Sequence, residues 1–169
     1  MSRVTLVLGG ARSGKSRHAE GLARRHKGRL VYVATAEITD DEMRERIVLH
    51  RDQRGTRWTT IEAPVDLIGE LRAADHANTF ILVECITIWI NNLMYHGRDV
   101  AAEVARLCAV LPEMRGRVVL VSNEVGLGIV PDNALARRYR DVLGRVNATW
   151  AAAAGEAYFV VAGRALRLE

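Results

Sequence analysis

Lysine is nearly absent from this sequence of 169 residues, and aromatic residues make up only 5% of it. The only two lysines are Lys15 and Lys27, so arginine supplies almost all of the formal net charge of +4. Arginine suits anionic ligands and carboxylate partners. Because the arginines are scattered along the chain and are not interleaved with aromatic residues, we expect no nucleic-acid partner.

Cysteine is also scarce. Cys85 and Cys108 are too few for a disulfide framework, and no paired Cys or His motif indicates a zinc site. No apolar run reaches the roughly 18 residues of a membrane span, and the N-terminus leads directly into an apolar strand rather than a signal peptide. We therefore expect a cytoplasmic protein without a membrane span, folded as a single domain over residues 1–169.

The segment VTLVLGGARSGKSRHAE, residues 4–20, is the one around which we expect the rest of the chain to be organised. Residues 4–8 are aliphatic except for one threonine, which predicts a buried strand. Residues 9–16 match the pattern G-x-x-x-x-G-K-[ST], and an apolar-periodic helix follows. This order of strand, glycine-rich loop and helix binds the phosphate chain of a nucleotide.

Each position of this loop has a task in phosphate binding. Backbone N–H groups turn toward the phosphate oxygens, and the loop residues that carry them are Gly9, Gly10, Ala11, Arg12, Ser13 and Gly14. Lys15 can reach the β- and γ-phosphates as a catalytic group, and the hydroxyl of Ser16 can ligate Mg²⁺. We therefore expect a nucleoside triphosphate, ATP or GTP, together with Mg²⁺.

Strands and helices alternate along the rest of the sequence. Further strands are expected at residues 30–34, 59–62, 80–83, 118–121 and 157–161, with a short edge strand at 166–168. Helices are expected at residues 15–25, from the capping box at 39–42 to Gly55, from Pro64 through Leu71, around 88–94, at 100–111 after Asp99, and from Asn133 through Trp150. This alternation predicts an α/β fold with a mostly parallel sheet and helices on both faces. Ligands of such sheets bind at the carboxyl ends of the strands.

Two acidic residues end predicted strands. Glu84 follows four apolar residues, where an acidic side chain can orient Mg²⁺ in phosphate-loop proteins, or can instead accept hydrogen bonds from a guanine edge. The sequence leaves both roles open. Glu62 and Asn123, taken alone, indicate only a cap or a solvated side chain.

His50 lies on a predicted helix face with Met43 and Ile47, among Arg46, Arg51 and Arg54. Neighbouring positive charges favour the neutral imidazole, which is the nucleophilic form. The spacing by itself favours a half-buried structural histidine. His18 follows the phosphate loop by one turn and is expected to pack there.

Five stretches together carry a family resemblance. They are GGARSGKSRHAE at 9–20, DDEMRERIVLHR at 40–51, ECITIW at 84–89, NEVGLGIVP at 123–131 and GRVN at 144–147. On these residues the sequence resembles the bifunctional adenosylcobinamide kinase / adenosylcobinamide-phosphate guanylyltransferases of cobalamin biosynthesis, over nearly the whole chain. Leu49 departs from those members that carry a second histidine beside the nucleophile.

The resemblance implies a RecA-like P-loop NTPase fold, a homotrimer, and His50 as the catalytic residue that becomes guanylylated. It also implies that the nucleotide contacts are residues 9–16, Ala34, Thr35, Ala36, Arg51, Asp52, Gln53, Arg54, Glu62 and Glu84. The substrates would be adenosylcobinamide and adenosylcobinamide phosphate, and we expect residues 125–131, whose aliphatic side chains are separated by two glycines, to form part of the corrinoid site.

The expected enzyme phosphorylates adenosylcobinamide with ATP or GTP and then transfers GMP from GTP to the product, giving adenosylcobinamide-GDP. Without the resemblance, the same residues also fit a small-metabolite kinase that has no covalent step. They further fit a nucleotide-dependent ATPase or binding module that acts on protein or nucleic acid. Covalent labelling by GTP distinguishes the first alternative, and a salt-dependent nucleic-acid complex distinguishes the second.

Overall fold

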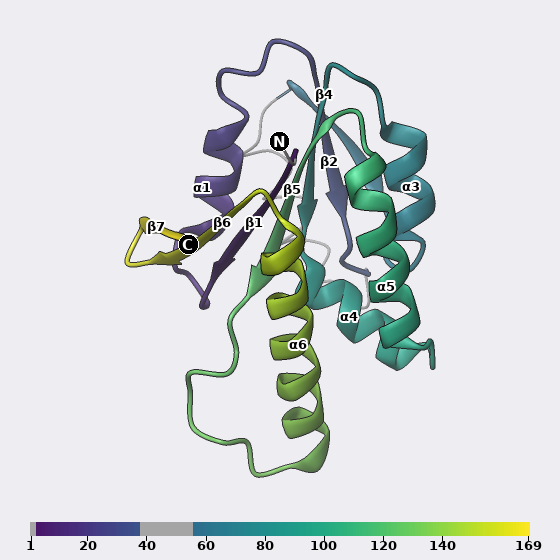
Figure 1. Cartoon of the computed structure of the whole chain (residues 1–169). Helices are drawn as coiled ribbons and strands as arrows, with labels where there is room; N and C mark the ends of the chain where they lie inside the picture. Colours follow the sequence, from purple (N-terminus) through teal and green to yellow (C-terminus); the bar gives the residue numbers. More distant parts are fainter. Residues whose placement is uncertain (1–2, 38–55) are drawn as a thin grey trace.

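A computed structural model of the chain describes residues 3–37 and 56–169. These residues form one seven-stranded sheet in the order β3-β2-β4-β5-β1-β6-β7 (Figure 1). The strands are β1 (Val4–Gly9), β2 (Arg29–Ala34), β3 (Trp58–Glu62), β4 (Thr79–Glu84), β5 (Arg117–Asn123), β6 (Glu156–Val161) and β7 (Arg164–Leu168). All neighbouring strands pair in parallel except β6 and β7, which form an antiparallel hairpin at the edge of the sheet.

Helices cover both faces of this sheet (Figure 1). They are α1 (Lys15–Leu22), α3 (Leu67–Ala74), α4 (Ile86–Tyr95), α5 (Val100–Val110), a 3-10 turn at Leu111–Glu113, and α6 (Ala134–Ala153). Helix α1 packs on one face, and α3, α4, α5 and α6 pack on the other. The predicted α/β fold with a mostly parallel sheet, of the P-loop NTPase type, is confirmed. The helix predicted from the capping box at 39–42 lies outside the described residues.

The two cores follow from the alternation of side chains along the strands. Val7, Leu82 and Val121 face α1, whereas Leu6 and Leu120 face the larger helical layer. Because both faces are covered, the central strands read as continuous apolar runs rather than alternating ones. No helix in the described ranges combines the length and the apolar character that a membrane span needs.

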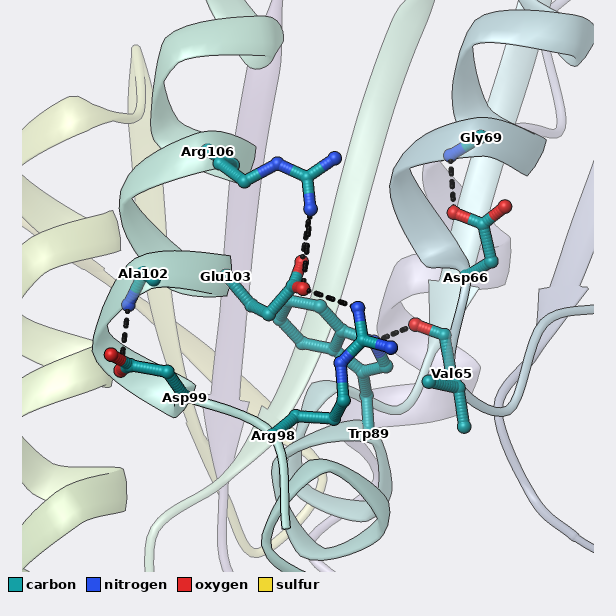
Figure 2. A network of polar contacts seen from close by, with 9 residues as sticks. All are labelled: Val65, Asp66, Gly69, Trp89, Arg98, Asp99, Ala102, Glu103 and Arg106. Atoms are coloured by element: carbon teal, nitrogen blue, oxygen red, sulfur yellow. Dashed lines mark hydrogen bonds and ion pairs between the residues drawn. The ribbon is translucent and has the colours of Figure 1, made fainter. Parts of the chain in front are cut away.

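Helix starts agree with the sequence at two of three sites. The side chains of Asp99 and Asn133 accept hydrogen bonds from Ala102 N (3.1 Å) and Ala136 N (2.7 Å), as predicted for N-caps. The helix expected from Pro64 begins instead at Leu67, because the Asp66 carboxylate accepts from Gly69 N at 3.0 Å and caps α3 there (Figure 2). Helix α1 ends at Leu22, three residues before the predicted end.

Buried polar contacts fasten the helical layer to the loops at the carboxyl edge of the sheet. Figure 2 shows Trp89 Nε1 donating to Val65 O at 2.9 Å, and Glu103 held between Arg98 and Arg106. A second link comes from α4, where Asn92 Nδ2 donates to the carbonyls of Thr35 (2.8 Å) and Pro64 (2.9 Å). One buried amide thus ties together the segments that follow β2 and β3.

Replacing Asn92 with leucine should lower the free energy of unfolding by about 2–4 kcal/mol, because two buried carbonyls lose their donor. Chemical denaturation measures this difference. Asn91→Leu is the matched control: its side chain is exposed on the same helix, and the substitution should change stability by less than about 0.5 kcal/mol. Equal effects of the two substitutions would contradict the bridging role of Asn92.

Candidate functional site

The phosphate loop connects the end of β1 to the start of α1 at the carboxyl edge of the sheet. Gly14 has φ +95° and immediately precedes the helix, and Arg12 also has a positive φ of 55°. The helix begins at Lys15, so the first N–H groups of α1 have no partner within the helix and point toward the space in front of the loop. An anion is stabilised at such a position by these donors and by the helix dipole.

Two positions of the loop require glycine because neighbouring atoms leave little room for a Cβ. A Cβ on Gly9 would lie 2.7 Å from the carbonyl oxygen of Val160 and would collide with the Ser13 hydroxyl. A Cβ on Gly14 would lie 3.2 Å from Gly163 Cα, at a φ that disfavours side chains. Gly163 N also donates to Ser13 O at 2.9 Å, so the turn of the β6–β7 hairpin supports the loop from behind.

Lys15 and Ser16 are half-buried and already hold polar partners. Lys15 Nζ donates to Gly10 O at 3.2 Å, which folds the ammonium group over the loop. The Ser16 hydroxyl donates to the carboxylate of Glu84 at the end of β4. Two side-chain oxygens that could hold Mg²⁺ are therefore adjacent at the position that the motif predicts, and Mg²⁺ commonly binds one or two protein oxygens together with substrate phosphates and waters. Among the described residues no cluster of three or more His, Cys, Asp or Glu side chains could hold a metal alone.

The register of the sheet aligns the predicted strand-end residues. Ala34 pairs with both Glu62 and Glu84, and alternation puts all three on the face of the sheet that carries α1. β2 lies between β3 and β4, so two strand spacings, about 10 Å, separate the strand ends that carry the carboxylates. Glu62 is exposed, whereas Glu84 is half-buried against Ser16. The two acids therefore face different parts of any ligand bound at this edge.

Thr35 is fully buried and its side chain is occupied. Its hydroxyl donates to Cys85 O at 2.7 Å and accepts from Cys85 N at 2.9 Å. Burial raises the pKa of the Cys85 thiol, which favours its protonated form. Of the predicted nucleotide contacts at residues 34–36, Thr35 thus fixes the chain to β4, and its hydroxyl is not directed at a ligand.

His18 packs beside the phosphate loop as expected. Its ring centroid lies 5.0 Å from that of Tyr158, and its Nε2 is buried without a hydrogen-bond partner in the described part of the chain. Burial lowers the pKa of His18. His50, the predicted nucleophile, lies outside the described residues. The predicted nucleotide contacts Arg51, Asp52, Gln53 and Arg54 also lie outside them.

A buried polar network at the end of β5 was not identified from the sequence. Asn147 on α6 accepts from the Ser122 hydroxyl at 2.7 Å and donates to Asn123 O at 3.0 Å. The Thr87 hydroxyl accepts from Asn123 N at 2.7 Å, and Tyr139 OH donates to Thr87 O at 2.7 Å. The available signal was a polar residue, Asn147, on the apolar stripe of α6.

The loop between β5 and α6 leaves the sheet beside the phosphate loop (Figure 1). Its root is fixed there because Glu124 N donates to Gly9 O at 3.1 Å. Beyond this point Leu127, Ile129 and Val130 are 81%, 98% and 61% exposed. The loop therefore presents exposed aliphatic side chains, while its role in a corrinoid site stays a prediction.

A groove of about 1220 Å³ lies elsewhere, between α4, α5 and α6. Its lining includes Tyr95, Val104 and Leu135 but no residue of the phosphate loop. This groove is thus separate from the phosphate loop.

Comparison with known proteins identifies the family. Residues 5–168 match the family described as cobinamide kinase / cobinamide phosphate guanyltransferase. The bifunctional adenosylcobalamin biosynthesis proteins CobU of Escherichia coli (strain K12) and of Salmonella typhimurium are each 42% identical over 181 residues, covering 98% of this chain and 99% of theirs. CobP of Pseudomonas aeruginosa is 42% identical over 166 residues, covering 97% of this chain and 96% of that protein. The chain therefore belongs to the cobinamide kinase / cobinamide phosphate guanyltransferase family.

Proposed function

We propose that this chain is a bifunctional enzyme of cobalamin biosynthesis. As a kinase it moves the γ-phosphoryl group of ATP or GTP to the aminopropanol hydroxyl of adenosylcobinamide. As a guanylyltransferase it moves GMP from GTP to the resulting phosphate and gives adenosylcobinamide-GDP. The observation that carries this proposal is the family match over residues 5–168, on a chain whose phosphate loop has the geometry that a triphosphate requires.

One triphosphate site serves both steps. The loop backbone and the N-terminus of α1 bind the phosphates. The ammonium group of Lys15, which donates to Gly10 O in this structure, moves to the β- and γ-phosphate oxygens when a nucleotide binds. A fixed positive charge there stabilises the negative charge that develops on the leaving group in either reaction.

The contact between Ser16 and Glu84 favours a metal role for Glu84. Both oxygens lie where they would hold Mg²⁺, and the bound metal would neutralise charge on the phosphate oxygens. Glu62 is then the carboxylate that accepts hydrogen bonds from the guanine base. It is exposed, and its strand ends about 10 Å from the strand that carries Glu84. A carboxylate can accept from two guanine N–H groups, which gives GTP its advantage over ATP in the transfer step.

His50 is the nucleophile of the transfer step. A neutral imidazole nitrogen attacks the α-phosphate, pyrophosphate leaves, and a phosphoramidate forms on the protein. The phosphate of adenosylcobinamide phosphate then attacks the same phosphorus and releases His50. Arg46, Arg51 and Arg54 neutralise the phosphates and favour the neutral ring.

The corrinoid binds against the loop at residues 125–131, whose exposed aliphatic side chains suit the apolar parts of a large macrocycle. The trimeric assembly, the cytoplasmic location and the single-domain organisation stay predictions from the sequence and its resemblance.

Lys15→Ala should reduce both activities by about 100-fold or more at saturating nucleotide, because both use the same phosphate site. Stability should change little, since the ammonium group contributes no core packing. Steady-state assays of each step and thermal unfolding test this. Lys27→Ala, which removes the other lysine at an exposed position, is the matched control and should retain both activities. If either activity of Lys15→Ala stays near wild type, the shared site is wrong.

Glutamine substitutions separate the two acids. Glu62→Gln should lower the preference for GTP over ATP in the transfer step by about 1–3 kcal/mol, because an amide cannot accept from both guanine N–H groups. Glu84→Gln should instead raise the Mg²⁺ concentration needed for half-maximal activity by about 10–100-fold. Competition assays and Mg²⁺ titrations of both variants measure these effects. An altered base preference in Glu84→Gln with an unchanged Mg²⁺ requirement would reverse the assignment.

The covalent step predicts selective labelling. GTP labelled on the α-phosphate should label the protein and GTP labelled on the γ-phosphate should not, because pyrophosphate departs. The label should resist base, be lost in acid as a phosphorus–nitrogen bond is, and be discharged by adenosylcobinamide phosphate. Denaturing gels with autoradiography record each outcome.

His50→Asn should abolish the label and the guanylyl transfer, while the kinase step, in which the hydroxyl attacks the γ-phosphate directly, should continue. His76→Asn, an exposed position at the opposite end of β4, is the control and should label normally. Labelling of His50→Asn would move the nucleophile elsewhere, first to His18. Transfer by a wild-type protein that never labels would indicate direct displacement.

A further inference from the structure

Asn123 is the last residue of β5, and the sheet register places it in the centre of the catalytic edge. β5 lies between β1, which leads into the phosphate loop, and β4, which ends in Glu84. Asn123 pairs directly with Gly9, the first residue of the loop. Val83 pairs with Leu120, so Asn123 stands two residues beyond the position opposite Glu84. The end of β5 is therefore next to both halves of the phosphate site.

The side chain of Asn123 belongs to the same face of the sheet as the nucleotide residues. Val119 and Val121 pack in the core beneath α1, and the period of two along a strand continues that face to Asn123. Ser122 points the other way, since its hydroxyl donates to Asn147 on α6. The Asn123 amide thus shares the α1 face with Glu84 and Gly9.

The backbone of Asn123 is held on both sides. Its N–H donates to the Thr87 hydroxyl at 2.7 Å and its carbonyl accepts from Asn147 Nδ2 at 3.0 Å. The next residue is held as well, because Glu124 N donates to Gly9 O. A side chain on a backbone fixed in this way has a defined position, as a group that acts on a reacting centre needs.

The carbonyl oxygen of this amide is not satisfied by the described part of the protein. Asn123 Oδ1 is buried and has no hydrogen-bond partner among the residues that the structure describes. A buried polar atom without a partner costs about 1–3 kcal/mol, so it calls for an explanation other than packing. A bound ligand that offers hydrogen-bonding groups at this edge would supply the missing partner.

We propose that Asn123 is a catalytic residue of the kinase step, whose side-chain amide contacts the γ-phosphoryl group and the attacking hydroxyl. This inference rests on the proposed function. We assign the contact to the γ-phosphate because Asn123 lies beside the Ser16 and Glu84 oxygens. These oxygens mark the end of the phosphate chain at which the motif predicts the metal. The α-phosphate, where His50 attacks, lies toward the other end.

The amide has the two hydrogen-bonding functions that the step needs. Nδ2 donates to an oxygen of the γ-phosphoryl group, and Oδ1 accepts from the acceptor hydroxyl and orients it. The hydroxyl oxygen forms a bond to the γ-phosphorus, the bond to the leaving nucleoside diphosphate breaks, and the hydroxyl proton is taken up by water. The amide is unchanged, so its contribution is orientation and stabilisation of charge in the transition state.

The test compares Asn123→Ala and Asn123→Asp with the wild type in three measurements. They are the kcat of the kinase step, covalent labelling by α-labelled GTP, and the dissociation constants of GTP and GDP by calorimetry. Asn123→Ala should lower the kinase kcat by about 100-fold and reduce the preference for GTP over GDP by about tenfold. Asn123→Asp should reduce that preference further, because a carboxylate repels the γ-phosphate. Affinity for GDP and labelling at saturating GTP should stay close to wild type.

Ser122→Ala is the matched control. It removes a buried hydroxyl from the neighbouring position on the opposite face, so it should lower thermal stability and leave the ratio of GTP to GDP affinity unchanged. The inference is wrong if Asn123→Ala keeps the wild-type kinase kcat and nucleotide preference. It is also wrong if kinase and labelling fall together with stability, or if neither Asn123 variant folds, since Asn123 would then be structural.

The same measurements separate this inference from the proposed function. If the wild type does not phosphorylate adenosylcobinamide, the proposed function fails. The comparison of GTP with GDP still tests the γ-phosphate contact in that case, because it needs no acceptor substrate.

Discussion

The hydrogen bond from Ser16 to Glu84 joins the start of α1 to the end of β4 and links the two parts of the candidate phosphate site. β5 lies between β4 and β1, so this single contact spans the strand that separates the two halves of the phosphate site. The parallel register ends β1 and β5 at the same level and places Glu84, the end of β4, two residues short of that level. The position of Glu84 beside the phosphate loop is thus set by strand pairing throughout the sheet rather than by the local sequence around Ser16.

Features with local causes were predictable from the sequence. The phosphate loop follows from the order of strand, glycines and helix, and the N-caps Asp99 and Asn133 use donors three residues away. Features that join distant segments were not predictable. Thr35 is a strand-end threonine in the sequence, but the structure commits its hydroxyl to Cys85, fifty positions along the chain. A single sequence carries no signal for such a pairing, since any buried hydroxyl seeks whichever backbone group the fold brings near.

The ambiguity of Glu84 shows why the candidate site needed the structure. Its position after an apolar strand is equally compatible with a metal ligand and with a base-reading carboxylate. The spacing of parallel strands removes part of this ambiguity, because Glu62 and Glu84 are separated by two strand spacings, about 10 Å, and cannot bind the same edge of one base. The partner of Glu84 in the protein, a serine hydroxyl at the phosphate loop, then favours the metal.

In the function proposed above, two reactions at one triphosphate need attacking groups at two different phosphorus atoms, while the phosphates stay on one loop. The loop is rigid because Gly9 and Gly14 lie against Val160 and Gly163, and because Gly163 N holds Ser13 O. The loop between β5 and α6 is rooted at Gly9, the first residue of the phosphate loop. The described part of the chain that precedes His50 ends at Glu37, three residues after β2. In the sheet, β2 and β1 are separated by β4 and β5. The carboxyl ends of several parallel strands therefore lie beside a phosphate loop that the turn between β6 and β7 holds in place.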